Sequence, residues 1–165
     1  MKESKIVAIF DVDGVLTNGS YIYDAQGKRY KIFGPDDAYA LKMIKNDINI
    51  VFVSSDERGF PISKARVNDM GFELNKVSYK ERMAWIDEHY PHQEWFRIYM
   101  GDSFTDATIF KDVDVGICPQ NGHEIAKSYA TYITKHIGGD RAVADAVFYI
   151  IEKILKKDLK TMIGL

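Results

Sequence analysis

The sequence predicts an α/β fold with a doubly wound, mainly parallel sheet. Short runs of apolar and β-branched residues alternate with segments of helical length, which is the pattern of right-handed β-α-β crossovers. Polar residues directly follow several of these runs, and in such sheets ligands bind beyond the carboxyl ends of the strands. The length of 165 residues is also typical of one domain with a substantial core, so we expect a single domain over residues 1–165.

The first strand is predicted at Ile6 to Phe10, a run too short to cross a membrane and too β-branched to favour a helix. Asp11 and Asp13 follow it, and residues two apart on an extended chain point the same way. Gly14 then allows a sharp turn. Two neighbouring carboxylates persist where a cation, a shared proton or a reaction uses them, although a solvated turn explains these two residues alone equally well.

A β-hairpin is predicted next, over about residues 19–33, because two aromatic-rich runs flank a turn that contains Gly27. An isolated two-stranded ribbon is marginally stable in water, so its aromatic residues need a surface to pack on. These residues are Tyr21, Tyr23, Tyr30 and Phe33. Either the domain's own core or another subunit could provide that surface, and the residues alone slightly favour the core.

The rest of the chain continues the alternation of helices and strands. In order we expect a helix capped by Asp36 or Asp37 that runs to about Lys45, a strand at Ile48 to Val53, a helix from Pro61 to about Met70, a short strand ending at Val77, a helix from about Lys80 to His89, a strand at Ile98 to Met100, a helix at Ala107 to Phe110, a strand at Val113 to Ile117, a helix at Glu124 to Tyr129, and a strand at Thr131 to Thr134. An amphipathic helix over about residues 140–157 closes the chain, with an apolar stripe made of Val143, Val147, Ile150, Ile151 and Ile154.

Composition limits the kinds of partner. With 22 basic and 24 acidic residues the net charge is −2, so no electrostatic signature of nucleic-acid or acidic-membrane binding is present and we expect a small-molecule partner. The single cysteine, Cys118, excludes an internal disulfide framework and a multi-cysteine zinc site, and a buried thiol is expected there. The amino-terminal residues lack the long apolar region of a signal peptide, which favours a cytoplasmic protein. The histidines are expected in surface or capping roles, although His123 and His136 could face a substrate.

Four motifs in order carry a family resemblance. They are DVDGVLT at Asp11 to Thr17, Ser54 at the end of a strand, Lys80 near a helix start, and GDSFTD at Gly101 to Asp106. Ser54 alone could be a helix cap, Lys80 a solvated helix residue and Asp106 a charge favoured by the helix dipole. Together, and in this order, they resemble the haloacid dehalogenase (HAD) superfamily of phosphohydrolases, which implies a HAD-type Rossmann-like fold.

The resemblance also implies a role for each residue. Asp11 would be the nucleophile that forms an aspartyl-phosphate, and Asp13 the general acid and then the general base. Ser54 and the amide of Val12 would donate to phosphoryl oxygens, and Lys80 would supply the positive side chain that the approach of two anions requires. Mg²⁺ would be held by Asp11, Asp102 and a main-chain carbonyl near Asp13, since these are hard oxygen ligands. Asp106 would hold the metal shell or Lys80 in place.

The spacing between motifs leaves no room for the inserted cap domain of many HAD enzymes. The chain therefore resembles the capless subclass, and in particular the 3-deoxy-D-manno-octulosonate 8-phosphate and nonulosonate 9-phosphate phosphatases. The segments that carry this likeness are Asp11 to Asn18, the hairpin, Lys31 to Leu41, and the GGDRAV string at Gly138 to Val143. In that family hairpins assemble a homotetramer in which a neighbouring subunit covers the active site, so the resemblance implies a tetramer here.

Three departures from the family affect the expected substrate. Ser54-Ser55-Asp56 stands where the family commonly has Thr-Gly-Arg, Gly101-Asp102-Ser103 where it has Gly-Asp-Asp, and Ala144-Asp145 where it has Arg-Glu. A keto-acid substrate needs cations for its carboxylate, so these changes weaken that expectation unless residues such as Arg58, Arg66 or Arg141 compensate. Ser55, Arg58 and Arg141 are the candidate substrate contacts. The alternative is a smaller polyol or amino-alcohol phosphate used in capsule or lipopolysaccharide synthesis.

Two non-enzymatic alternatives are weaker. A phospho-receiver domain also places acidic residues at strand ends, but its acidic pair is adjacent and its phosphorylated aspartate lies on a later strand. A regulatory or scaffold HAD protein that has lost catalysis is disfavoured because the full set of motif residues is present. No dinucleotide-binding or P-loop string occurs.

Overall fold

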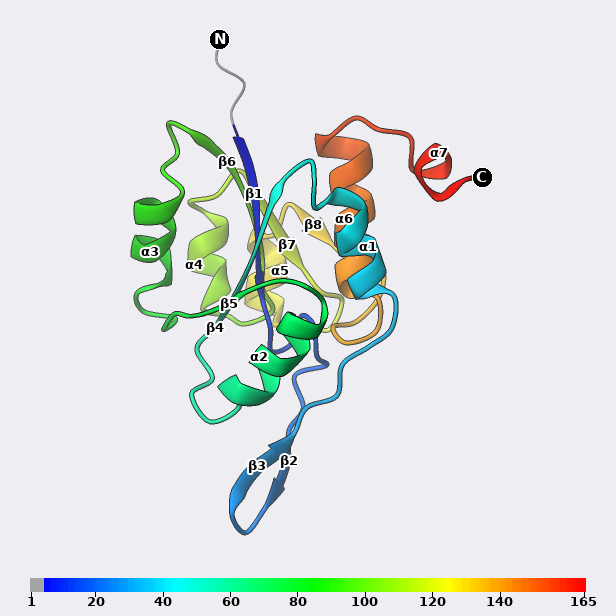
Figure 1. Ribbon diagram of the computed structural model, residues 1–165. Coiled ribbons are helices and arrows are strands. Elements are labelled where there is room, and N and C mark those ends of the chain that lie inside the picture. Colours follow the sequence, from blue (N-terminus) through cyan, green and yellow to red (C-terminus); the bar gives the residue numbers. More distant parts are fainter. Residues whose placement is uncertain (1–4) are drawn as a thin grey trace.

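The computed structural model describes residues 5–165 and contains a six-stranded parallel sheet with a separate two-stranded hairpin (Figure 1). The sheet order is β5-β4-β1-β6-β7-β8. Its strands are β1 (Lys5–Asp11), β4 (Asn49–Ser54), β5 (Leu74–Lys76), β6 (Trp95–Met100), β7 (Val115–Cys118) and β8 (Tyr132–Ile133). The predicted α/β fold with a parallel sheet is confirmed, and β1 lies near its centre between β4 and β6.

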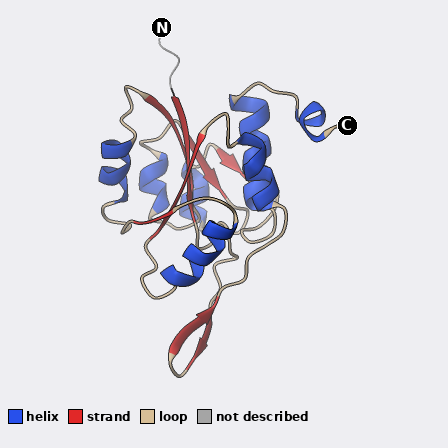
Figure 2. Ribbon diagram, viewed as in Figure 1, coloured by secondary structure: helices blue, strands red, loops and turns tan. Residues whose placement is uncertain are grey.

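Helices cover both faces of the sheet, because successive residues of a buried strand point to opposite sides. Ala8 and Phe10 of β1 pack in the cluster that includes the helices α1 (Asp37–Ile44), α2 (Phe60–Asp69) and α6 (Ala142–Tyr149). Val7 and Ile9 pack in a second cluster with α3 (Arg82–His89), α4 (Asp106–Phe110) and α5 (Glu124–Tyr129). Figure 2 shows the helices on either side of the strands.

The hairpin, formed by β2 (Ile22–Asp24) and β3 (Gly27–Tyr30), projects from the carboxyl end of the sheet (Figure 1). Tyr21, Tyr23 and Tyr30 on it are exposed. Phe33 is different, because it is half-buried against the domain's own core and bridges to Thr17. The domain's own core thus provides the surface for Phe33, as the residues alone favoured, whereas the three tyrosines do not belong to either hydrophobic cluster of the described residues.

Several element boundaries differ from the sequence prediction. β6 begins at Trp95 rather than Ile98, and α3 begins at Arg82 rather than Lys80. Neither aspartate caps α1 with its side chain, because Asp36 pairs with Arg141 and Asp37 accepts from the amide of Ala144 in α6.

The closing helix is also shorter than predicted. α6 passes into a π-helical turn, η1 (Ile150–Ile154), and the chain then turns at Lys156, whose φ is 55°, before a separate helix α7 (Leu159–Ile163). The predicted apolar stripe is buried from Val143 to Ile151 and half-buried at Ile154. None of the helices in residues 5–165 is both long enough and apolar enough for a membrane span.

Candidate active site

The loop after β1 is held tightly by its own backbone and by Thr17. The Thr17 hydroxyl accepts from the amides of Gly14, at 3.1 Å, and Gly19, at 3.2 Å. Gly14 has φ of +80°, and a Cβ there would lie 2.0 Å from a carboxylate oxygen of Asp102. Gly138 packs so closely on the Gly14 and Thr17 carbonyls that it also has no room for a side chain. These contacts fix the backbone from which Asp11 and Asp13 project.

Three carboxylates meet at the carboxyl ends of β1 and β6. Asp11, Asp102 and Asp106 each offer an oxygen within 4.8 Å of the others, and we call these residues the acidic cluster. Burial, together with the neighbouring carboxylates, raises the pKa of Asp11 and that of Asp102 to about 7, although Arg82 partly opposes this at Asp11. The cluster could hold a metal ion, because a hard divalent cation would bind these oxygens and relieve their repulsion.

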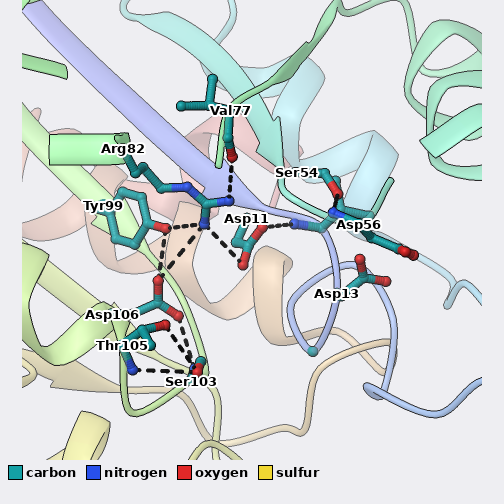
Figure 3. A network of polar contacts seen from close by, with 12 residues as sticks. Asp11, Asp13, Ser54, Asp56, Val77, Arg82, Tyr99, Ser103, Thr105 and Asp106 are labelled. Atoms are coloured by element: carbon teal, nitrogen blue, oxygen red, sulfur yellow. Dashed lines mark hydrogen bonds and ion pairs between the residues drawn. The ribbon is translucent and has the colours of Figure 1, made fainter. Parts of the chain in front are cut away.

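The cation beside Asp11 is Arg82, which the sequence analysis did not select (Figure 3). Its guanidinium is buried and lies 3.2 Å from Asp11 and 3.9 Å from Asp106, and it donates to the Tyr99 hydroxyl and the Val77 carbonyl. Lys80 is exposed on the surface, with its ammonium 5.9 Å from the centre of the Tyr79 ring. The structure therefore places Arg82, rather than Lys80, against the predicted nucleophile.

Asp106 is held from three sides. The Tyr99 hydroxyl donates to one of its oxygens at 2.9 Å, the Ser103 amide donates to the other at 2.9 Å, and Arg82 lies nearby (Figure 3). Burial raises the pKa of the Tyr99 hydroxyl well above its ordinary value, so Tyr99 stays a donor. Tyr99 and Asp106 together fix the position of the guanidinium, as the sequence analysis expected Asp106 to do for a lysine.

Asp13 belongs to a second group of charges at the base of the hairpin, which we call the hairpin-root cluster: Asp13, Asp56, Lys28 and Lys31. The Lys31 ammonium lies 2.7 Å from one oxygen of Asp13 and 2.8 Å from Asp56. Lys28 lies 2.5 Å from Asp56. These two ammonium groups and the Gly59 amide lower the pKa of Asp56 to about 2, against the opposing effect of burial.

A cavity of about 410 Å³ opens beside Asp11 and Arg82. Its lining is Asp11, Ser55, Tyr79, Arg82, Ser103, Phe104 and Thr105. Ser54 is buried, and its hydroxyl accepts from the Asp56 amide at 3.2 Å, while the Val12 amide donates to Asp11 at 2.9 Å. Of the candidate substrate contacts, Ser55 lines the cavity.

The two candidate arginines do not line this cavity. Arg58 is exposed, and Arg141 is exposed and pairs with Asp36 and Asp140. His123 caps α5 by accepting from the Ile125 amide, as expected for a capping histidine. His136 pairs with Asp145 through its ring at 2.9 Å.

Sequence reasoning missed Arg82, Tyr99 and Lys31 as parts of the site. Arg82 lies in a predicted helix and Tyr99 in a predicted strand, where each was counted as an element residue only. Lys31 was noted only within the segment that carries the family resemblance. One signal in the sequence could have found them. A long polar side chain within a segment that packs into the core is buried only when it is paired, so such a residue is a candidate partner for the carboxylates.

The chain is similar to known proteins in sequence and in fold. Residues 97–147 match the family model of haloacid dehalogenase-like hydrolases. The 3-deoxy-D-manno-octulosonate 8-phosphate phosphatase of Yersinia pestis is 27% identical over 151 residues, which cover 87% of this chain and 78% of that protein.

Solved structures show the same likeness. The cobalt-bound form of the deoxy-D-mannose-octulosonate 8-phosphate phosphatase of Haemophilus influenzae superposes with a TM-score of 0.81 at 25% identity, over 98% of this chain and 97% of that one. The Moraxella catarrhalis 3-deoxy-D-manno-octulosonate 8-phosphate phosphatase, solved with magnesium, phosphate and KDO, superposes with a TM-score of 0.77 at 24% identity, over 92% of this chain and 87% of that one.

The fold, the strand-end carboxylates and these relatives define a haloacid dehalogenase-like hydrolase. Within that class the chain is similar to the capless 3-deoxy-D-manno-octulosonate 8-phosphate phosphatases. Neither interval between its motifs carries an inserted cap domain within residues 5–165; the hairpin β2–β3 is the excursion after the first motif.

Proposed function

We propose that this phosphatase hydrolyses a phosphomonoester through an aspartyl-phosphate on Asp11, with Mg²⁺ as its cofactor. The observation that carries the proposal is the acidic cluster at the end of β1, with buried Arg82 against Asp11 and a cavity opening beside them. Three carboxylates and one guanidinium leave an uncompensated negative charge, which suits a divalent cation and, through it, a phosphate dianion.

The first chemical step joins an Asp11 oxygen to phosphorus while the bond from phosphorus to the leaving oxygen breaks. Asp13 donates a proton to that oxygen and releases the alcohol. Asp13 then accepts a proton from water as the water attacks phosphorus, which regenerates the Asp11 carboxylate and yields inorganic phosphate. Arg82 neutralises charge next to the nucleophile, and the Ser54 hydroxyl and Val12 amide donate to phosphoryl oxygens.

Asp11, Asp102 and the main-chain carbonyl near Asp13 would hold the metal ion, with Asp106 either as a further ligand or as the anchor of Arg82. When bound, Mg²⁺ supplies positive charge for the phosphoryl oxygens and lowers the repulsion between them and Asp11. The raised pKa of Asp11 and of Asp102 supports this assignment, because a cation restores both to the ionised form.

For the substrate we propose a small phosphorylated precursor of surface polysaccharide, either of the octulosonate phosphate type that the relatives' names indicate or of the similar nonulosonate phosphate type. One observation favours the alternative of a smaller polyol or amino-alcohol phosphate. Arg82 is the cation among the described cavity-lining residues and is committed to the acidic cluster, while Asp56 holds Lys28 and Lys31. A substrate carboxylate would thus find no free cation within this lining.

We also propose that the single domain assembles as a homotetramer in which a neighbouring subunit covers the site. The exposed tyrosines Tyr21, Tyr23 and Tyr30 support this, because the hairpin that carries them projects beyond the carboxyl end of the sheet (Figure 1). Light scattering at micromolar concentration should give the mass of four chains. A monomer at that concentration would contradict the assembly without affecting the reaction.

The decisive experiment measures phosphate release from a panel of octulosonate, nonulosonate, hexose, polyol and amino-alcohol phosphates, with Mg²⁺ or with EDTA, by the wild type and Asp11→Asn. We expect Mg²⁺-dependent release that Asp11→Asn lowers by at least about 10⁴-fold, as loss of a nucleophile does. The best kcat/KM in the panel identifies the substrate class. A folded protein that releases phosphate from none of these compounds would refute the proposal.

A further inference from the structure

Lys31 is a buried cation at the base of the hairpin that contacts the proposed acid and base, Asp13. Its side chain is 0% exposed, and its ammonium approaches both Asp13 oxygens, at 2.7 and 2.9 Å. Ser63 accepts from it at 2.8 Å and Asp56 pairs with it at 2.8 Å. The Lys31 ammonium carries three protons, and three side chains with oxygen acceptors surround it. A long lysine side chain is rarely buried to this extent unless it is paired.

The partners of Lys31 are themselves fixed. Asp56 also pairs with Lys28 and accepts from the Gly59 amide at 3.1 Å, so it lies in one position. Lys28 in turn lies 3.5 Å from the centre of the Tyr21 ring. At Gly59 a Cβ would lie 2.5 Å from the Lys31 side chain, so the wall of this site is the backbone itself. The residues at the base of the hairpin thus fix the position of the Lys31 ammonium relative to Asp13.

We propose that Lys31 is the positioning residue of Asp13 in the phosphatase reaction, with Asp56 and Ser63 as its supports. This inference rests on the proposed function. A carboxyl group can accept from an ammonium in both its ionised and its protonated form, so the contact holds Asp13 in place through proton donation and proton uptake. Asp56 in this chain acts toward Lys28 and Lys31, which makes it a structural anion rather than a contact for the substrate.

If Lys31 positions Asp13, its loss should slow substrates with a poor leaving group more than substrates with a good one. In the first step the phosphorus–oxygen bond of the substrate breaks as the bond to Asp11 forms, and the leaving oxygen takes the Asp13 proton. A phenolate without electron-withdrawing groups is a poor leaving group and needs that proton, whereas 4-nitrophenolate leaves without it. Phenyl phosphate and 4-nitrophenyl phosphate share nearly the same shape, so their comparison isolates the proton transfer from binding.

The test measures kcat/KM for these two compounds, because kcat/KM reports the steps up to formation of the aspartyl-phosphate. With a misplaced acid, Lys31→Met should lower kcat/KM about 10- to 100-fold for phenyl phosphate, and less than about threefold for 4-nitrophenyl phosphate. Arg29→Met is the matched control, since Arg29 lies on the same hairpin and pairs with exposed Asp24. It should leave the ratio of the two values unchanged.

Ser63→Ala is the second variant, which removes one acceptor of Lys31 and keeps its charge. It should shift the same ratio in the same direction by about two- to fivefold, and it serves alone if circular dichroism shows that Lys31→Met is unfolded. An equal loss on both compounds, or an unchanged ratio in the folded variants, would overturn the positioning role. A wild type that releases phosphate neither from these two compounds nor from any member of the substrate panel would instead refute the phosphatase proposal, so the two failures are distinguishable.

Discussion

The acidic cluster includes Asp11 at the end of β1, the hairpin-root cluster includes Asp13 two residues later, and the charge balance of the two clusters is opposite. In the acidic cluster three carboxylates face one guanidinium, and burial raises the pKa of Asp11 and of Asp102 to about 7. In the hairpin-root cluster two carboxylates face two ammonium groups, and the pKa of Asp56 falls to about 2. One group of charges is satisfied by its own chain, and the other is not.

The difference in charge balance indicates that the two clusters have different roles. An unbalanced, partly open cluster has affinity for a cation from solution, and this affinity is what phosphoryl transfer requires. A balanced, closed cluster has no such affinity and instead fixes geometry, here that of Asp13 and of the hairpin. The contrast also accounts for Asp56 standing where the family commonly has arginine, because an arginine there would face Lys28 and Lys31 with a third positive charge.

Among the cations beside the two clusters, the largest expected effect comes from Arg82. Arg82→Met should lower kcat by about 100-fold or more, because it removes the positive charge beside the nucleophile and leaves Asp11 and Asp106 unpaired. Lys80→Met, the matched change two residues earlier, should stay within about twofold of the wild type because Lys80 is exposed. A large loss in Lys80→Met with an active Arg82→Met would reverse the assignment.

An intermediate effect is expected from the balanced cluster. The folded-state pKa of Asp56, about 2, lies below the usual 3.8, so its pairing stabilises the fold above pH 4 and this contribution is lost as the pH falls toward 2. Asp56→Asn should therefore lower the free energy of unfolding by about 2 kcal/mol at pH 6. Urea denaturation at pH 6, 4 and 2.5 measures this difference, which should shrink with the pH. A difference independent of pH would point to packing instead.

The smallest expected effect is an increase in stability, and it concerns Asp102 in the metal-free protein. Without metal, the folded-state pKa of Asp102, about 7, lies above 3.8, so the native state binds more protons and loses stability as the pH rises from 4 to 7. In EDTA at pH 8, Asp102→Asn should be more stable than the wild type by about 1 kcal/mol, and the two should converge near pH 4.

Saturating Mg²⁺ should reverse that order, because a ligand that binds the native state stabilises it and Asp102→Asn loses a metal ligand. Thermal melts of both proteins with Mg²⁺ and with EDTA measure the reversal. An unchanged order in the two conditions would contradict a metal site in the acidic cluster.

Much of the framework followed from local patterns. Strand runs, turn glycines and helix periodicity depend on neighbouring residues, so the parallel sheet, the hairpin and the positions of Asp11, Ser54 and Asp102 at strand ends were predictable. Boundaries were less so. The break after η1 and the start of α3 depend on contacts with other elements, and local propensity does not encode them.

The sequence by itself determined that carboxylates would gather beyond β1 and β6, because alternation along a strand and the parallel arrangement leave no other place for them. Only the tertiary structure decided which cations meet them. Arg82 lies in the first turn of α3 and is directed inward, whereas Lys80 precedes the helix and stays outside. Lys31 reaches Asp13, Asp56 and Ser63 across 18 to 32 residues of chain. Such pairings depend on how distant elements pack, since a long side chain can reach many places until its surroundings are fixed.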